Sequence, residues 1–335
     1  MSGPARPWLA PLVPFYRLGQ ALSQARKPVR RLVWPVVSIG NLSTGGAGKT
    51  PLTIALAKAL TSRGLRVDVL SRGYGRAASG TELVQKEGGA ERFGDEPLLI
   101  ARQAGVPVYV GRKRYEAGLL AESEQKPNAP AVHLLDDGFQ HRQLHRDVDI
   151  LLVNSHDLTD ALLPAGNLRE PLQALQRATV IAIPADEPEV EQYLREIISI
   201  GRNSETSRWT GPIWRLHRRM QVPPVAGPAV AFCGIARPEQ FFTGIEAARV
   251  KLVARIPFPD HHRYTPKDLD QLRAVLRSTG ASSLLTTEKD AVRLGALAAK
   301  LRFKTVPLRT EIENESAAMK WLVERLSSSS PKPSL

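Results

Sequence analysis

A glycine-rich turn between an apolar run and a helical pattern is the feature that most constrains this chain. The apolar run covers residues 35–39 and the helical pattern covers residues 52–60. A strand, a glycine-rich turn and a helix in this order are typical of a phosphate-binding loop, because glycines let backbone N–H groups wrap around phosphates. The residues predicted to hold a nucleotide are Ser43, Thr44, Gly45, Gly46, Ala47, Gly48, Lys49 and Thr50. Lys49 is expected to reach the β- and γ-phosphates, and Thr50 to offer an oxygen to Mg²⁺.

Acidic residues follow a second apolar run, as expected for the magnesium side of such a site. Residues 131–135 predict a buried strand, and Asp136 and Asp137 come directly after it. One or both carboxylates are expected to hold the metal, although Asp-Asp-Gly is also common in plain turns. Further buried strands are predicted at residues 65–70, 147–153 and 178–183, with helical stretches between them. This pattern predicts an α/β protein with a doubly wound parallel sheet of the P-loop NTPase type.

The length of 335 residues suggests two domains, at about 150 residues each. Residues 202–228 are rich in Arg, Trp, Pro and Gly and are interpreted as the region between the domains. Beyond it, strands are expected at residues 229–233, 283–287 and 303–307, and helices at 238–246, 266–278 and 315–326. The expected organisation is an N-terminal segment at 1–34, a P-loop domain at 35–215, a smaller C-terminal α/β domain at 216–326 and a disordered tail at 327–335.

The N-terminal segment combines apolar and basic residues. Phe15, Leu18 and Leu22 recur at helical spacing, and the first 34 residues contain six basic side chains and no acidic one. This predicts a short amphipathic helix, which either packs on the body of the protein or lies on an anionic membrane surface. The net charge of +13 favours polyanions or anionic lipids as partners. No apolar run reaches about 18 residues, so neither a spanning helix nor a cleavable signal peptide is expected.

Titratable residues outside the loop have two interpretations each. Asp95 and Glu96 precede a helical pattern, which favours a role as helix caps; the alternative is that one of them is a general base. His141 and His145 are spaced i, i+4, but no third ligand is in sight, so contacts at the surface or with substrate are expected rather than zinc. His261 stands in an Asp-His-His loop, which predicts either a catalytic appendage or an exposed cap.

Seven separated blocks carry a resemblance to a known family. They lie at residues 37–51, 71–75, 94–97, 135–141, 164–171, 258–262 and 286–290. In this order, over nearly the whole chain, they resemble the tetraacyldisaccharide 4'-kinase family of lipid A biosynthesis. The resemblance implies transfer of the ATP γ-phosphate to the 4'-hydroxyl of an acylated glucosamine disaccharide 1-phosphate, with Mg²⁺ as cofactor and lipid IVA as product. It also implies a peripheral protein at the cytoplasmic face of a Gram-negative inner membrane.

The same resemblance implies roles for single residues. It makes Asp95 the general base for the sugar hydroxyl, His261 its partner and Lys49 the third catalytic residue. Thr50 keeps its expected metal contact, and Asp136 and Asp137 are implied to bind the metal or to belong to the phosphate network. Substrate contacts are implied for Arg72, Glu96, His141, Asn167, Arg169 and Glu170. The family favours the membrane interpretation of the N-terminal helix, and neither nucleic acid nor an obligate protein partner is expected.

Two other classes of protein share part of these features. A membrane- or DNA-associated partition-type ATPase fits the P-loop and the net charge, but Thr44 stands where such ATPases carry a signature lysine, and only 6% of the residues are aromatic. A membrane-tethered nucleotide switch would bind nucleotide and leave no phosphorylated product. The single cysteine, Cys233, excludes an intramolecular disulfide and favours a reducing cytosolic compartment.

Overall fold

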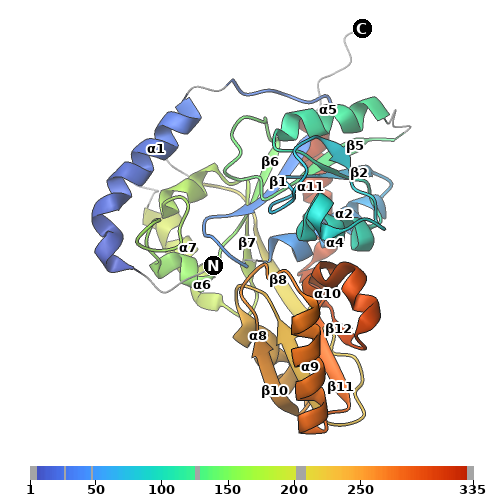
Figure 1. Cartoon of the computed structure of the whole chain (residues 1–335). Helices are drawn as coiled ribbons and strands as arrows, with labels where there is room; N and C mark the ends of the chain where they lie inside the picture. Colours follow the sequence, from blue (N-terminus) through green and yellow to red (C-terminus); the bar gives the residue numbers. More distant parts are fainter. Residues whose placement is uncertain (1–5, 26–27, 47, 125–128, 201–208, 330–335) are drawn as a thin grey trace.

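The larger domain is built on a nine-stranded sheet, counted over the part of the chain that the structure describes. The computed structural model describes residues 6–25, 28–46, 48–124, 129–200 and 209–329, and Figure 1 shows their arrangement. The strand order is β13-β8-β7-β6-β1-β5-β2-β4-β3. These strands are Val36–Asn41 (β1), Arg66–Ser71 (β2), Glu82–Leu83 (β3), Val108–Val110 (β4), Ala131–Asp136 (β5), Val148–Leu152 (β6), Val180–Pro184 (β7), Ile213–Met220 (β8) and Leu308–Ile312 (β13).

The central strands are parallel and buried on both faces, which explains their apolar runs. The antiparallel pairs in the described sheet, β3–β4 and β8–β13, stand at its two edges. One face is covered by Lys49–Thr61 (α2), Asp95–Ala104 (α4), which follows the short helix Ala90–Phe93 (α3), and Glu315–Ser329 (α11). The other face is covered by Arg114–Glu124 (α5), Ser155–Thr159 (α6) and Pro188–Ile200 (α7). This is the doubly wound arrangement that the sequence predicts.

A parallel sheet, with four strands among the described residues, forms the smaller domain, which lies at the bottom of Figure 1. Its order is β10-β9-β11-β12, with strands Ala229–Cys233 (β9), Leu252–Pro257 (β10), Ser283–Thr287 (β11) and Lys304–Val306 (β12). Pro238–Ala247 (α8) packs on one face and Pro266–Thr279 (α9) on the other. Glu288–Leu294 (α10) packs against α4 of the larger domain, so it lies where the two domains meet.

The two sheets divide the chain differently from the expected boundaries. β8 runs across the expected boundary at residue 215, within the stretch interpreted as inter-domain, and belongs to the larger sheet. β13 and α11 also return to the larger domain, although residues up to 326 were expected in the smaller one. The physical reason is that β13 is an edge strand and β8 lies next to it, and both mix polar and apolar residues, so neither segment alone shows which strand it pairs with. Residues 327–329 of the expected disordered tail are helical, because α11 continues to Ser329, and residues 330–335 lie outside the described part.

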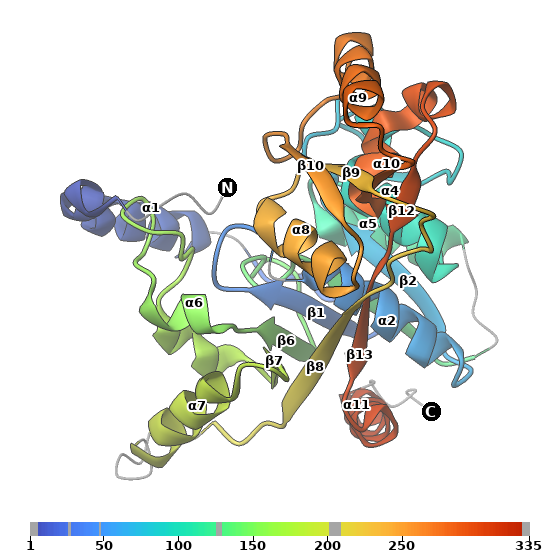
Figure 2. The same ribbon diagram turned by 90° about the horizontal axis from the view of Figure 1, so that it is seen from below.

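The predicted N-terminal helix is present as Val13–Ala25 (α1), after the 3₁₀ helix Pro7–Leu12 (η1). Figure 2 shows α1 at the side of the larger sheet, away from the smaller domain. Its polar side contacts the body, because Tyr16 Oη and Gln20 Nε2 donate to the Arg169 carbonyl at 3.2 and 2.7 Å. Its apolar side chains face solvent: Phe15 and Leu18 are 71% and 58% exposed, and Trp8 of η1 is 72% exposed. The helix therefore docks through polar contacts and leaves its apolar face uncovered.

Candidate functional site

Lys49 begins α2 directly after the glycine-rich turn. Gly48 precedes it in a left-handed conformation, with φ 89°, which glycine adopts readily because it lacks a Cβ. The Lys49 ammonium donates to Asn41 Oδ1 at 2.9 Å and lies 3.4 Å from Asp137 Oδ1. Asn41 is buried at the end of β1, so it fixes the lysine at the mouth of the turn. Thr50 follows Lys49 and is buried in the first turn of the helix.

The other residues of the turn show which part of it is open. Ser43 is buried and accepts from the Asn41 side-chain amide at 3.2 Å. Gly45 has a positive φ of 108°, and Gly46 is exposed. Ala47 lies outside the described residues. The turn therefore has a fixed base and a glycine-rich tip at the surface, where a phosphate can approach backbone N–H groups.

A segment that follows β6 braces the turn from one side. The Thr44 N–H donates to the Asn167 carbonyl at 2.8 Å, and the Arg169 N–H donates to the Leu42 carbonyl at 2.6 Å. The Asn167 side-chain amide donates to Asp160 Oδ2 at 2.8 Å. Asn167, predicted to contact substrate, therefore reaches the turn through its backbone and uses its side chain to hold its own loop.

Asp136 is a buried carboxylate with weak hydrogen-bond donors. It ends β5, is 2% exposed, and receives the Thr53 and Ser71 hydroxyls at 3.4 Å each. Burial, together with the charges of Glu96 and Asp137, raises the pKa of Asp136 to about 7. A carboxylate in this situation gains strongly from a nearby cation.

Asp137 has the opposite surroundings. Arg169 Nη1 donates to both of its carboxylate oxygens, at 3.1 and 2.9 Å, and also to Gln140 Oε1 at 3.2 Å. Burial alone would raise the pKa of Asp137, but Lys49 and Arg169 hold it below its usual range. Asp137 is therefore already neutralised by side chains, and it ties Lys49 to Arg169.

Asp95 and His261 come from different domains and meet at the domain boundary. Asp95 begins α4, and His261 lies in the loop between β10 and α9, with a positive φ of 58°. Nδ1 of His261 lies 3.2 Å from Oδ2 of Asp95, and Arg293 Nε donates to the same oxygen at 2.7 Å. Burial alone would raise the pKa of Asp95, but His261, Arg293 and Lys289 hold it well below its usual range. The hydrogen bond to Asp95 raises the pKa of His261.

Glu96 forms a second contact between α4 of the larger domain and the smaller domain. Lys289, from α10, donates to Glu96 Oε1 at 2.6 Å and lowers the pKa of Glu96 despite its burial. Lys49 also lowers the pKa of Glu96, and Glu96 raises that of Asp136. The nucleotide turn, the two adjacent aspartates and the Asp95–His261 pair therefore lie within one electrostatic field.

Three further predicted substrate residues are spread around this centre. Arg72 is exposed just beyond the end of β2, and His141 is half-buried in the loop after β5. Glu170 is 3% exposed and lies between Arg142 at 3.0 Å and Arg177 at 2.8 Å. Burial raises the pKa of Glu170. Its two guanidinium partners make Glu170 part of an internal ion-pair cluster, whereas Arg72 remains accessible to a ligand.

Sequence reasoning missed several residues that shape the site. Arg293, Lys289 and Asn41 contact predicted residues, and no role had been expected for them. Arg114 is buried at the start of α5, and burial together with the charge of Arg72 lowers its pKa to about 10. Lys289 and Asn41 lie inside the blocks at 286–290 and 37–51, which is a signal by which the sequence could have pointed to them. Arg293 and Arg114 lie outside every block, so no motif marks them in the sequence.

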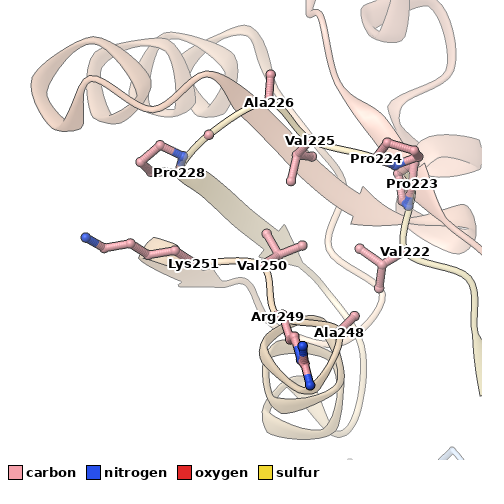
Figure 3. Close-up of a pocket in the computed structure, with 11 residues that line it drawn as sticks. Val222, Pro223, Pro224, Val225, Ala226, Pro228, Ala248, Arg249, Val250 and Lys251 are labelled. Atoms are coloured by element: carbon pink, nitrogen blue, oxygen red, sulfur yellow. The ribbon is translucent and has the colours of Figure 1, made fainter.

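A cavity of about 610 Å³ lies away from this site, at the beginning of β9 and β10 in the smaller domain. Figure 3 shows it between the segment from Val222 to Pro228 and the segment from Ala248 to Lys251. None of the predicted site residues lines it. His261 and Gly234 follow the opposite ends of the same strands, so the cavity and the Asp95–His261 pair lie at opposite ends of the smaller sheet.

The fold and the site together define a class of protein. A phosphate-binding turn follows the central strand β1, two adjacent aspartates stand at the end of its parallel neighbour β5, and a carboxylate–histidine pair joins the two domains next to them. This is a P-loop enzyme of the kinase type.

Comparison with known proteins also indicates a kinase. The family described as Tetraacyldisaccharide-1-P 4'-kinase, LpxK, matches residues 5–327. The tetraacyldisaccharide 4'-kinase of Koribacter versatilis is 39% identical, over 88% of this chain and 90% of that protein. That of Gluconobacter oxydans is 35% identical, over 95% and 94%. The crystal structure of the "apo" form of LpxK from Aquifex aeolicus in complex with ATP is similar, with a TM-score of 0.71 and 30% identity over 95% of this chain and 99% of that one.

The chain therefore belongs to the tetraacyldisaccharide-1-P 4'-kinase family. The family resemblance and the α/β P-loop fold expected from the sequence are both confirmed.

Proposed function

We propose that this enzyme transfers the γ-phosphate of ATP to the 4'-hydroxyl of tetraacyldisaccharide 1-phosphate, giving lipid IVA. The observation that carries the proposal is the pairing of Asp95 and His261, 3.2 Å apart, in the same electrostatic field as the phosphate-binding turn. In the reaction the sugar oxygen forms a bond to the γ-phosphorus, the bond from that phosphorus to the β–γ bridging oxygen breaks, and ADP leaves. Such transfer depends mainly on positioning and on neutralising charge.

Lys49 and the N-terminal end of α2 bind the phosphates of ATP in this proposal. The ammonium already sits between Asn41 and Asp137, so little side-chain entropy is lost when a phosphate arrives. Arg169 holds the opposite side of Asp137. These fixed groups stabilise negative charge on the transferred phosphoryl group without having to reorganise.

Mg²⁺ fits this site through oxygen donors. Among the described residues no group of three or more His, Cys, Asp or Glu side chains forms a metal cage. The ion of such kinases keeps waters and binds phosphate oxygens together with one or two protein oxygens. The groups that would hold it are the Thr50 hydroxyl and the buried Asp136 carboxylate, which within the described part of the chain is hydrogen-bonded by hydroxyl groups. When bound, Mg²⁺ would offset the negative charge of the phosphates during transfer.

Asp95 accepts the proton of the sugar hydroxyl. Its carboxylate is ionised at neutral pH because His261, Arg293 and Lys289 outweigh its burial. His261 orients the carboxylate through Nδ1 and spreads the charge of the pair. Because the two residues come from different domains, the base is complete only when the domains are together.

We place the enzyme at the cytoplasmic face of the inner membrane, as a peripheral protein. No helix among the described residues has the length and apolar character needed to span a bilayer. The uncovered apolar side of α1, with Phe15 and Leu18 exposed, and the exposed Trp8 of η1 support binding to a membrane surface. An acylated substrate stays in that surface, so this arrangement brings enzyme and substrate together.

The proposal is tested with purified protein in detergent, Mg²⁺, γ-labelled ATP and tetraacyldisaccharide 1-phosphate, followed by chromatography of the lipid. We expect labelled lipid from the wild type, and turnover lowered about 10²-fold or more in Asp95→Ala with ATP binding nearly unchanged. Lys49→Ala should lower turnover by a similar factor. Asp270→Ala removes an exposed carboxylate on α9 and serves as the matched control.

Other outcomes distinguish the alternatives. Nucleotide binding without labelled lipid would favour a nucleotide switch. ATP hydrolysis stimulated by DNA, with binding weakened by salt, would favour a partition-type ATPase. Full activity of Asp95→Ala would remove Asp95 from the role of base.

A further inference from the structure

Arg293 contacts both members of the proposed base. Its Nε donates to Asp95 Oδ2 at 2.7 Å, and its Nη2 lies 2.5 Å from the same oxygen. Nη2 also lies 3.2 Å from Nδ1 of His261. The guanidinium side chain is 5% exposed, so these contacts are shielded from water. Arg293 belongs to α10 of the smaller domain, whereas Asp95 belongs to the larger one.

The smaller domain fixes Arg293 from behind. Its Nη1 donates to the Gly234 carbonyl and to Asp290 Oδ1, the latter at 3.2 Å. Asp290 is fully buried and also accepts from the Tyr264 hydroxyl at 2.9 Å and from the Gly234 N–H at 3.0 Å. The guanidinium group therefore has a fixed direction, and its other edge, with Nε and Nη2, faces Asp95. A group held in this way can position a partner at small entropic cost.

The contacts of Asp95 with Arg293 and His261 all use one oxygen. Arg293 and Nδ1 of His261 both lie against Oδ2. An Asp carboxylate has two oxygens, so a carboxylate with Oδ2 occupied presents Oδ1 to an incoming hydroxyl.

We propose that Arg293 is a positioning residue, which fixes Oδ2 of Asp95 so that Oδ1 accepts the proton of the acceptor hydroxyl. This inference rests on the proposed function and adds a residue to it. The reacting atoms contact Asp95, and Arg293 acts through Asp95.

Removal of Arg293 should be detectable through the pKa values of Asp95 and His261, which depend on the charges around Asp95. Arg293 and Lys289 face it from α10, His261 faces it from the loop before α9, and Glu96 is its neighbour on α4. Arg293 lowers the pKa of His261, and Asp95 raises it. Without Arg293, Asp95 loses a fixed cation and its pKa rises; the pKa of His261 rises as well.

The experiment compares wild type, Arg293→Met and Arg293→Lys in the detergent kinase assay across pH. In Arg293→Met we expect kcat to fall about 10- to 100-fold while KM for ATP stays within about twofold. The acidic limb of log kcat against pH should move up by about 1 to 3 units, the usual effect of one nearby opposite charge. Arg293→Lys keeps the charge and should recover part of both effects.

Arg309→Met is the matched control. Arg309 also bridges the domains, because it binds Glu288 of α10 at 2.9 Å and Gln103 of α4 at 3.1 Å, but it does not contact Asp95. Its kcat and acidic limb should stay near those of the wild type. Equal losses in Arg309→Met and Arg293→Met would show a general loosening of α10 and overturn the proposal, as would a wild-type profile in Arg293→Met.

A second readout does not need the reaction. NMR titration of His261, assigned with His261→Gln, should give a higher pKa in Arg293→Met than in the wild type. An unchanged His261 pKa would overturn the positioning role even if Arg293→Met proved too unstable for kinetics. Absence of labelled lipid from the wild type would instead overturn the proposed function, so the two failures are distinct.

Discussion

At the scale of single residues, Gly234 joins the parts of the proposed base. Its carbonyl accepts from the His261 N–H at 3.2 Å and from Arg293, and its N–H donates to Asp290. A Cβ built on Gly234 would lie 3.0 Å from the Pro259 carbonyl oxygen and 3.2 Å from Asp290 Oδ1. These distances are shorter than ordinary van der Waals contacts, and the atoms involved belong to the backbone and to a buried side chain. Close approach therefore requires glycine here.

Gly234→Ala should displace the loop that carries His261. We expect kcat to fall about 10-fold, because an error of about 1 Å in a reacting group is costly, whereas KM for ATP should change little. Gly80→Ala is the matched control, because a Cβ on Gly80 meets nothing within 4 Å. Steady-state kinetics and thermal unfolding of both variants test this. Normal kcat in Gly234→Ala would contradict the argument.

Motif residues were the predictable part of the site. Lys49, Asp136 and Asp95 could be found because each lies in a short pattern with a chemical reason for its composition. Arg293 could not, since it is separated from Asp95 by 198 residues and no local pattern marks it. The engagement of Asn167 by Asp160 was equally hidden, because the choice between a ligand and a neighbouring carboxylate depends on the folded loop.

At the scale of elements, β5 carries a buried histidine that joins it to β2, to α5 and to the entry into β1. Nδ1 of His133 lies 2.6 Å from Asp68, and Nε2 lies 3.3 Å from Glu122. The His133 ring stacks on Trp34, with centroids 4.9 Å apart, and Glu122 accepts the Trp34 N–H at 2.8 Å. Burial alone would lower the pKa of His133, but Asp68 and Glu122 raise it to about 9.

His133→Gln should destabilise the fold and change its pH dependence. Removing one partner of a buried ion pair costs about 3–5 kcal/mol. In the wild type the pKa of His133 is raised above its model-peptide value of 6.5, so its stabilisation is complete below pH 6.5 and is lost as pH rises to about 9. Burial also raises the pKa of Asp68, which changes stability in the same direction. Urea unfolding of the wild type and of His133→Gln across pH 6 to 10 tests this. If the free energy of unfolding changed with pH equally in both proteins, the prediction would be contradicted.

Elements differed in how far the sequence predicted them. The buried strands β1, β2, β5, β6 and β7 read as apolar runs because helices cover both faces of the sheet. β9 and β11 were expected at the residues where they occur, for the same reason. β8 reads Ile-Trp-Arg-Leu-His-Arg-Arg-Met, and its exposed face carries charges that pair with β13 and α7. Its assignment to a sheet depends on those distant partners, so the domain boundary could not be placed from the local pattern.

At the scale of the whole molecule, the position of α1 connects the surface charge to the site. The chain carries a net charge of +13, and α1 leaves Phe15, Leu18 and Leu22 exposed on one side. Its other side binds the Arg169 carbonyl, and the Arg169 side chain binds Asp137 beside the nucleotide turn. A membrane contacted by α1 would therefore lie close to the site, at the side of the larger sheet seen in Figure 2.

Replacing Phe15 and Leu18 together by serine should weaken binding to vesicles. Each change removes apolar surface worth about 1.5–3 kcal/mol when buried, so partitioning should fall about 10-fold or more. Cosedimentation with vesicles containing anionic lipid measures this, and added salt should weaken binding of the wild type because the attraction to the basic chain is screened. Activity on detergent-dispersed substrate should remain. Leu119→Ser removes an apolar side chain that is 44% exposed on α5 and should leave binding unchanged. If the double variant binds anionic vesicles as tightly as the wild type does, α1 is not the membrane contact, and the basic surface alone must hold the protein there.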